Sequence, residues 1–74
     1  MSTPKIRLAL ARRLRQLRLK KGYTQEQAAE RADLDIRYYQ RLESKNPNAV
    51  KIDTLERLAK GLGVPVWKLV QFKD

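Results

Sequence analysis

The side chains best suited to recognition chemistry in this chain are Arg37, Tyr38, Gln40 and Arg41. An arginine can bind the edge of guanine through two hydrogen bonds, and glutamine can bind adenine in the same way. On a helix, Arg37 and Arg41 would lie one turn apart on the same face. Such a helix, if exposed, could reach base edges in a DNA major groove. The alternative is that these arginines are solvated and pair with neighbouring aspartates.

Composition argues against catalysis and metal binding. The chain has no histidine and no cysteine, and its eight acidic residues are scattered. The commonest general base and metal ligand are therefore missing, as are the thiolates needed for a metal site or disulfide. We predict no catalytic residue, no metal site and no cofactor, and hence no enzyme.

The net charge of +9 indicates a polyanionic partner. Residues 1–23 contain eight basic residues and no acidic one. A solvated helix face is one alternative, and a membrane-surface helix with leucines between arginines is another. The rest of the chain needs this helix for its core, which favours nucleic acid over membrane. We expect its arginines (Arg12, Arg13 and Arg15) to supply a long-range field more than direct contacts.

Targeting signals are absent from the sequence. No apolar run approaches the roughly 20 residues that a membrane span needs, and the N-terminus lacks the apolar stretch of a signal peptide. We therefore expect a cytoplasmic protein, associated with the nucleoid when bound to DNA. A length of 74 residues predicts a single domain over 1–74. We expect no ligand-sensing domain, so that control would come from concentration and cooperativity.

Five helices and no strand are predicted. The first spans about 4–21, with Thr3 as N-cap, Pro4 at the first helical position and Gly22 as the stop. The residues of its apolar stripe are Ile6, Leu10, Leu14 and Leu17. The second helix begins at Thr24, where Gln27 completes a capping box.

A break at 33–35 separates the second helix from the third. Leu34 is expected to fill the angle between the two helices, and Asp35 to cap the third. Tyr39 and Leu42 are the residues of the third helix that are expected to face the core. A loop follows over 44–51, and a fourth helix carries the apolar residues Ile52, Leu55, Leu58, Ala59 and Leu62. Gly61 and Gly63 are expected to end it, and Pro65 to start a short last helix.

These motifs resemble the Cro/repressor-type helix-turn-helix family, also called XRE-type. The matching segments are Arg15-Gln-Leu-Arg18, Gly22-Tyr-Thr-Gln25, Ala28-Ala29-Glu30, Leu34, Arg41-Leu-Glu43 and Asp53-Thr-Leu-Glu-Arg-Leu-Ala-Lys-Gly-Leu-Gly63-Val. The resemblance covers residues 10–70. It implies an all-α, five-helix lambda-repressor-like fold with the helix-turn-helix core at 24–44. The recognition helix, about 35–45, would enter the major groove of double-stranded DNA.

The resemblance also assigns roles to individual residues. The predicted base-contacting residues are Ile36, Arg37, Tyr38, Gln40 and Arg41, with Gln40 as a groove or phosphate contact. The predicted phosphate-contacting residues are Gln25, Lys45, Asn46 and Asn48. Arg18 is expected to form a structural ion pair with Glu43.

The sequence departs from the family pattern at three places. Asp33 replaces the usual glycine of the turn, which an aspartate tolerates less easily in a left-handed conformation. Asp35 replaces the usual serine or threonine cap and would repel a nearby phosphate. The loop after Glu43 is about one residue longer, which changes where its side chains would meet DNA.

We therefore predict a sequence-specific transcriptional regulator that acts as a homodimer on a palindromic operator. Its expected dimer patch consists of Val66, Trp67, Val70 and Phe72, which could instead form the lid of the core. The alternative function is an antitoxin or adaptor whose main partner is another protein and whose DNA binding is secondary.

Overall fold

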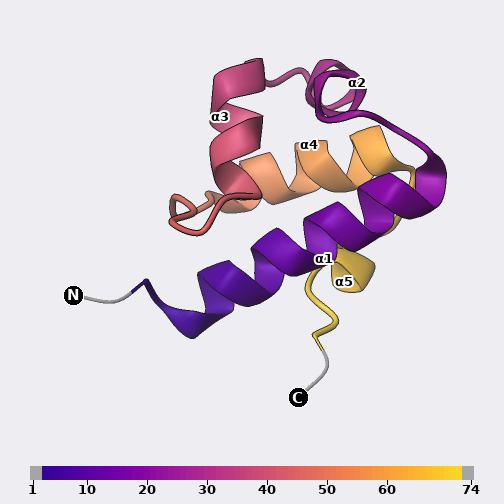
Figure 1. Cartoon of the computed structure of the whole chain (residues 1–74). Coiled ribbons are helices and arrows are strands. Elements are labelled where there is room, and N and C mark those ends of the chain that lie inside the picture. The colour runs from indigo at the N-terminus through magenta and orange to yellow at the C-terminus, as the bar shows by residue number, and fades with distance from the viewer. Residues whose placement is uncertain (1–2, 73–74) are drawn as a thin grey trace.

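The computed structural model describes residues 3–72, which form five helices and no strand (Figure 1). The helices are α1 (Lys5–Lys21), α2 (Gln25–Arg31), α3 (Ile36–Leu42), α4 (Ile52–Leu62) and α5 (Val66–Leu69). The predicted all-α class and the order of the five helices are confirmed.

The long helix α1 crosses the molecule below α2 and α3, and α4 lies between these two layers in Figure 1. α4 contacts α1, α2 and α5, and α2 also packs against α3. The start of α1 lies on the same side of the molecule as the α3–α4 loop (Figure 1). α4 therefore supports the helix-turn-helix from inside while α3 remains at the edge.

The core is formed by apolar side chains from all five helices. Its largest fully buried members are Leu14 of α1, Tyr39 and Leu42 of α3, Leu58 and Leu62 of α4, and Leu69 of α5. α2 contributes only small side chains, Ala28 and Ala29, followed by Ala32 at its end. Because these side chains are short, α4 can approach the backbone of α2 closely.

Gly61 shows how close this approach is. A Cβ atom at Gly61 would lie 2.8 Å from the nitrogen of Ala32 and 2.9 Å from its Cα atom. The Arg31 Nε donates a 2.8 Å hydrogen bond to the carbonyl oxygen of Gly61 at the same crossing. Gly61 thus lies inside α4 and does not end it, which corrects the sequence-based expectation. Gly63 alone is the left-handed cap, with φ 69°.

Two predictions about the start of α1 were wrong. α1 begins at Lys5 with Pro4 as its N-cap residue, and Thr3 makes no capping hydrogen bond. The Thr3 hydroxyl donates instead to the side-chain oxygen of Asn46 at 2.9 Å. Ile6 and Ile52 are 67% and 78% exposed. Both residues belong to the apolar stripe of their helix, but they lie near its start, where no other helix covers the stripe.

Candidate nucleic-acid interface

The α2–turn–α3 unit is fixed by hydrogen bonds at each end. Thr24 and Gln27 form the predicted capping box, with reciprocal bonds of 3.0 and 2.9 Å. Asp33 adopts φ 57°, the left-handed conformation that glycine usually occupies. Arg57 of α4 donates hydrogen bonds to the backbone oxygen of Asp33 and to its carboxylate. α4 therefore holds a turn that an aspartate would otherwise adopt at a cost.

The Arg57 contact was missed by the sequence analysis, because no local pattern links a residue on α4 to a turn 24 positions earlier. The remaining local expectations hold. Asp35 caps α3, and its carboxylate accepts hydrogen bonds from the backbone N–H groups of Arg37 at 2.8 Å and Tyr38 at 3.3 Å. Leu34 packs against the core within the turn.

α3 has one buried face and one exposed face. Tyr39 and Leu42 are buried in the core as predicted. Arg37, Gln40 and Arg41 are exposed. The two other predicted base-contacting residues, Ile36 and Tyr38, are half-buried and pack against the core. The exposed face of α3 therefore presents two guanidinium groups and one amide.

An ion pair attaches the end of α3 to α1. The Arg18 guanidinium donates to both carboxylate oxygens of Glu43, with Nε–Oε2 2.7 Å and Nη2–Oε1 3.0 Å. Arg18 also donates to the carbonyl oxygen of Tyr23 at 2.9 Å. The side chains of Arg18 and Glu43 are only 10% and 3% exposed. This contact between the two residues paired by the family resemblance fixes the position of α3 on the body of the domain.

The charges of this pair change the acidities around it. Burial alone would raise the pKa of Glu43, but the combined effect of the Arg18 guanidinium and the neighbouring Tyr39 and Gln25 side chains lowers it. The hydrogen bond to Glu43 raises the pKa of Arg18. Burial raises the pKa of Tyr39, whose hydroxyl lies inside without a hydrogen-bond partner among the described residues. The pair is therefore fully ionised at neutral pH.

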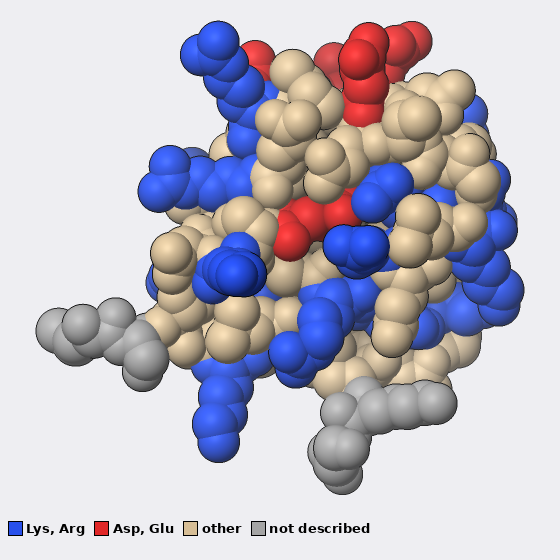
Figure 2. Space-filling model, in the orientation of Figure 1, with Lys and Arg blue, Asp and Glu red and all other residues tan. Residues whose placement is uncertain are grey.

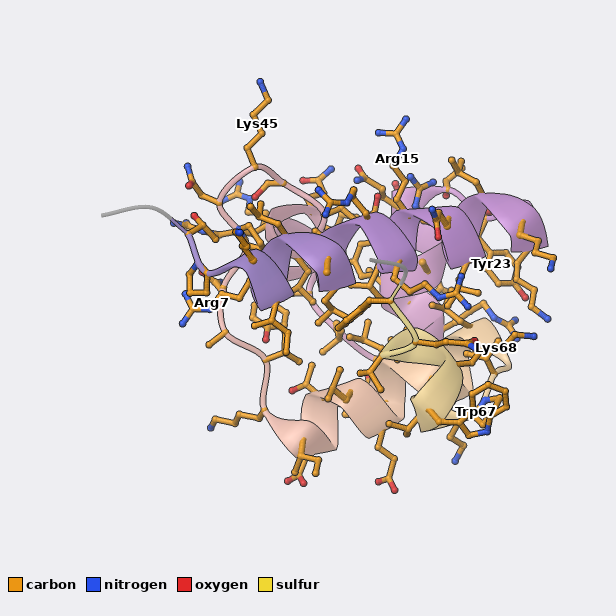
Figure 3. The ribbon with its side chains drawn as sticks, turned by 90° about the horizontal axis from the view of Figure 1, so that it is seen from below. Arg7, Arg15, Tyr23, Lys45, Trp67 and Lys68 are labelled. Atoms are coloured by element: carbon orange, nitrogen blue, oxygen red, sulfur yellow. The ribbon has the colours of Figure 1, made fainter. Side chains whose placement is uncertain are left out.

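The predicted phosphate-contacting residues lie near the C-terminal end of α3. Gln25 is half-buried, and its amide donates to Glu43 at 3.2 Å, so its side chain is held beside the ion pair. Lys45 is exposed and extends away from the domain (Figure 3). Asn46 is exposed and bonded to Thr3, and Asn48 is half-buried. The structure thus gathers Gln25, α3 and the 45–48 loop on one part of the surface.

Charge is distributed unevenly over this surface. In Figure 2, acidic side chains appear at the top, over the end where α2 and α3 lie, and at the centre of the face, whereas basic side chains lie at the centre, in the lower part and along both edges. The exposed acidic residues of the α2–α3 region are Glu26, Glu30, Asp33 and Asp35. α1 has no acidic residue in its first turn and three basic residues in its last.

The arginines of α1 do not all have the same role. The Arg13 Nε donates a 2.9 Å hydrogen bond to the backbone oxygen of Lys68, which ties α1 to α5. Arg13 therefore has a structural contact and does not act only through its charge. Arg12 and Arg15 are exposed.

The predicted dimer patch lies largely on the surface. Val66, Trp67 and Val70 are 37%, 62% and 41% exposed, and Phe72 is half-buried. Trp67 projects from α5, on the side of the molecule away from Lys45 (Figure 3). A groove of about 510 Å³, not foreseen from the sequence, lies beside the patch. Its lining includes Ile6, Leu10, Val50, Leu55, Val70 and Phe72.

Nowhere in 3–72 do three or more histidine, cysteine, aspartate or glutamate side chains gather in a way that would hold a metal ion. None of the described helices has both the length and the apolar character needed to cross a membrane.

Comparison with known proteins identifies the family. The helix-turn-helix family model matches residues 14–66. A hypothetical transcription factor of Neisseria meningitidis serogroup B is 34% identical over 65 residues, which are 88% of this chain and 60% of that protein. The chain therefore spans less than two thirds of that relative's length. The crystal structure of the Neisseria factor covers 90% of this chain and 76% of its own, with 33% identity and a TM-score of 0.83.

Two restriction-modification controller proteins have the same fold. C.AhdI from Aeromonas hydrophila is 30% identical, with 85% of this chain and 94% of its own covered and a TM-score of 0.80. C.Esp1396I, solved bound to a 19 base pair DNA duplex, is 29% identical, with coverages of 88% and 89% and a TM-score of 0.78. The chain belongs to the XRE-type helix-turn-helix family of DNA-binding regulators.

Proposed function

We propose that this protein is a sequence-specific regulator of transcription that binds double-stranded DNA in the cytoplasm. The observation that carries the proposal is the exposed face of α3, with Arg37, Gln40 and Arg41 on a helix fixed from behind by the Arg18–Glu43 pair. A buried ion pair that orients an exposed basic helix gives the rigid positioning that base recognition requires. The DNA-bound structure of C.Esp1396I supports the same partner for this chain.

The proposed recognition contacts divide into two groups. Arg37 and Arg41 bind base edges, with each bidentate pair contributing about 1–3 kcal/mol of discrimination between bases. Gln40 binds at the edge of the major groove. Ile36 and Tyr38 contact apolar parts of the bases or sugars beside the groove. Gln25, Lys45, Asn46 and Asn48 bind phosphates and set the register.

The test begins with selection of duplexes from a random library at about 0.15 M salt, near physiological screening. We expect an enriched motif. Binding to the selected duplex is then compared for Arg37→Ala, Arg41→Ala and Lys60→Ala, the last being an exposed lysine of α4 outside the proposed face. Each arginine variant should lose preference at one base step, whereas Lys60→Ala should retain all preferences. If both arginine variants keep the full preference, α3 is not the reading element.

We further propose a homodimer formed through Val66, Trp67, Val70 and Phe72. An indole that is 62% exposed between two exposed valines is a typical element of a protein interface. A two-fold dimer would place its recognition helices about 34 Å apart and require an inverted repeat in the operator. Sedimentation of the wild type and of Trp67→Ser should give a dimer and a monomer, respectively.

The same exposed patch supports a second candidate, an antitoxin or adaptor that docks on another protein through α5. A wild-type protein that stays monomeric alone and elutes from its native host with a stoichiometric protein partner would favour this function. An inverted repeat from the selection, together with a dimer in solution, would favour the regulator.

A further inference from the structure

α1 lies alongside the proposed DNA-binding surface and is fixed there at two points. At its start, the Thr3 hydroxyl donates to Asn46 of the loop that follows α3. Near its end, Arg18 holds Glu43 at the end of α3. These ties join α1 to segments 43 and 25 positions away in sequence. The part of α1 between them is therefore positioned beside the C-terminal end of α3 and the loop that follows it.

Arg15 lies in this part, one helical turn before Arg18. Because residues three apart on a helix are neighbours on its surface, the side chain of Arg15 lies on the flank next to the ion pair. In Figure 3, Arg15 and Lys45 extend to the same side of the molecule. Trp67 lies on the other side. α1 thus presents a cation in the same direction as the phosphate-contacting loop.

Arg15 has no structural task that would explain this position. It is exposed, and among residues 3–72 its side chain takes part in none of the hydrogen bonds or ion pairs that engage other arginines, such as Arg13, Arg18 and Arg57. The guanidinium is therefore available to a ligand. Its five N–H donors and permanent charge suit a phosphate oxygen.

We propose that Arg15 binds the DNA backbone directly, so that α1 adds a phosphate contact to those of Gln25 and the 45–48 loop. This inference rests on the proposed function and goes beyond it. It also replaces our expectation that Arg15 acts mainly through a long-range field. The contact contributes affinity and register and carries no base preference, because phosphates are the same at every step.

The test separates a contact from a field by using two variants with the same charge change. Arg15→Ala and Lys20→Ala each remove one positive charge from an exposed position of α1. Five residues apart, the two side chains point about 140° away from each other around the helix. A long-range field is weakened equally by both substitutions, whereas a contact is lost in only one.

Dissociation constants are measured between 50 and 200 mM salt for the selected duplex and for a scrambled duplex of equal length. For Arg15→Ala we expect the log–log salt slope to fall by about 0.9 per protomer bound. The ratio of the dissociation constant of Arg15→Ala to that of the wild type should therefore fall about 3.5-fold per protomer over this fourfold range of salt. The change should be the same on both duplexes. Arg15→Lys should retain the wild-type slope, because it retains the charge.

Two results would overturn the inference while leaving the proposed function intact. In one, Arg15→Ala and Lys20→Ala change the slope equally; in the other, Arg15→Ala weakens binding to the selected duplex alone. A wild type that does not distinguish the two duplexes would overturn the proposed function itself. Circular dichroism at each salt concentration shows that all variants remain folded.

Discussion

Replacing Arg18 with methionine would leave the Glu43 carboxylate buried without a cation. The size of the stability loss depends on burial, because a surface ion pair contributes only about 0–1 kcal/mol. The Arg18 and Glu43 side chains are only 10% and 3% exposed, so this pair is a buried one. Removal of one partner from a buried pair costs about 3–5 kcal/mol. At about 0.05–0.15 kcal/mol per residue, the 74-residue domain has a total of about 4–11 kcal/mol. Arg18→Met should therefore remove a large part of its stability.

The assay is urea unfolding followed by circular dichroism for the wild type, Arg18→Met, Glu43→Leu and the double variant. The double variant removes the stranded charge together with its partner, so it should be within about 1 kcal/mol of the wild type. The two single substitutions would then be strongly non-additive. A loss below about 1 kcal/mol in Arg18→Met, or additive losses in the double variant, would refute the buried-pair reasoning.

The dependence of folding stability on pH provides a second check of the buried pair, because the pKa of Glu43 should shift in opposite directions in the wild type and in Arg18→Met. In the wild type the pKa of Glu43 is lowered by folding, so its contribution is present above the ordinary value near 4.3 and is lost as the pH falls through the lowered value. In Arg18→Met we expect burial to raise the pKa of Glu43. The variant should then gain stability as the pH falls from 7 toward 4.5, while the wild type does not.

Three other substitutions test separate parts of the structure. Gly61→Ala should destabilise the domain by about 1–3 kcal/mol in urea unfolding, because the new Cβ would meet the backbone of Ala32 at 2.8 Å; Lys60→Ala is the control on the same helix. Tyr39→Phe should leave thermal stability unchanged or raise it, because the hydroxyl it removes is buried and has no hydrogen-bond partner within residues 3–72. Asp35→Ser keeps an N-cap and removes a negative charge near the DNA, so it should lower the Kd for the selected duplex with little change in melting temperature.

The local parts of the fold could be predicted from sequence because their causes are local. The capping box at Thr24, the cap at Asp35 and the stop at Gly22 each depend on two to four neighbouring residues, and all three are present. The apolar periodicity also predicted that Tyr39 and Leu42 would be buried. Periodicity does not show where the covering helix ends, and Ile6 and Ile52 are exposed although they belong to the apolar pattern of their helices.

The long-range contacts could not be predicted in the same way. Periodicity does not show that Thr3 meets Asn46 or that Arg57 holds the turn at Asp33, because both contacts depend on how the helices pack. The Arg18–Glu43 pair was found in advance only through the family resemblance. For the proposed DNA contacts, the sequence identified Arg37 and Arg41 by their spacing, and the structure adds the exposure of their shared face.

The uneven charge around α3 has a consequence for how the domain would sit on DNA. The N-terminal end of α3 carries the carboxylates of Asp33 and Asp35, both exposed, and a phosphate near them would be repelled. The other end, where Arg18 of α1 pairs with Glu43, leads to Lys45, and Arg15 extends to the same side of the molecule as Lys45 (Figure 3). Attraction is therefore concentrated at the C-terminal end of α3, and Arg41 would approach the bases more closely than Arg37. In this arrangement Arg15 of α1 and Lys45 of the loop would supply the attraction to phosphate that the two aspartates at the turn oppose.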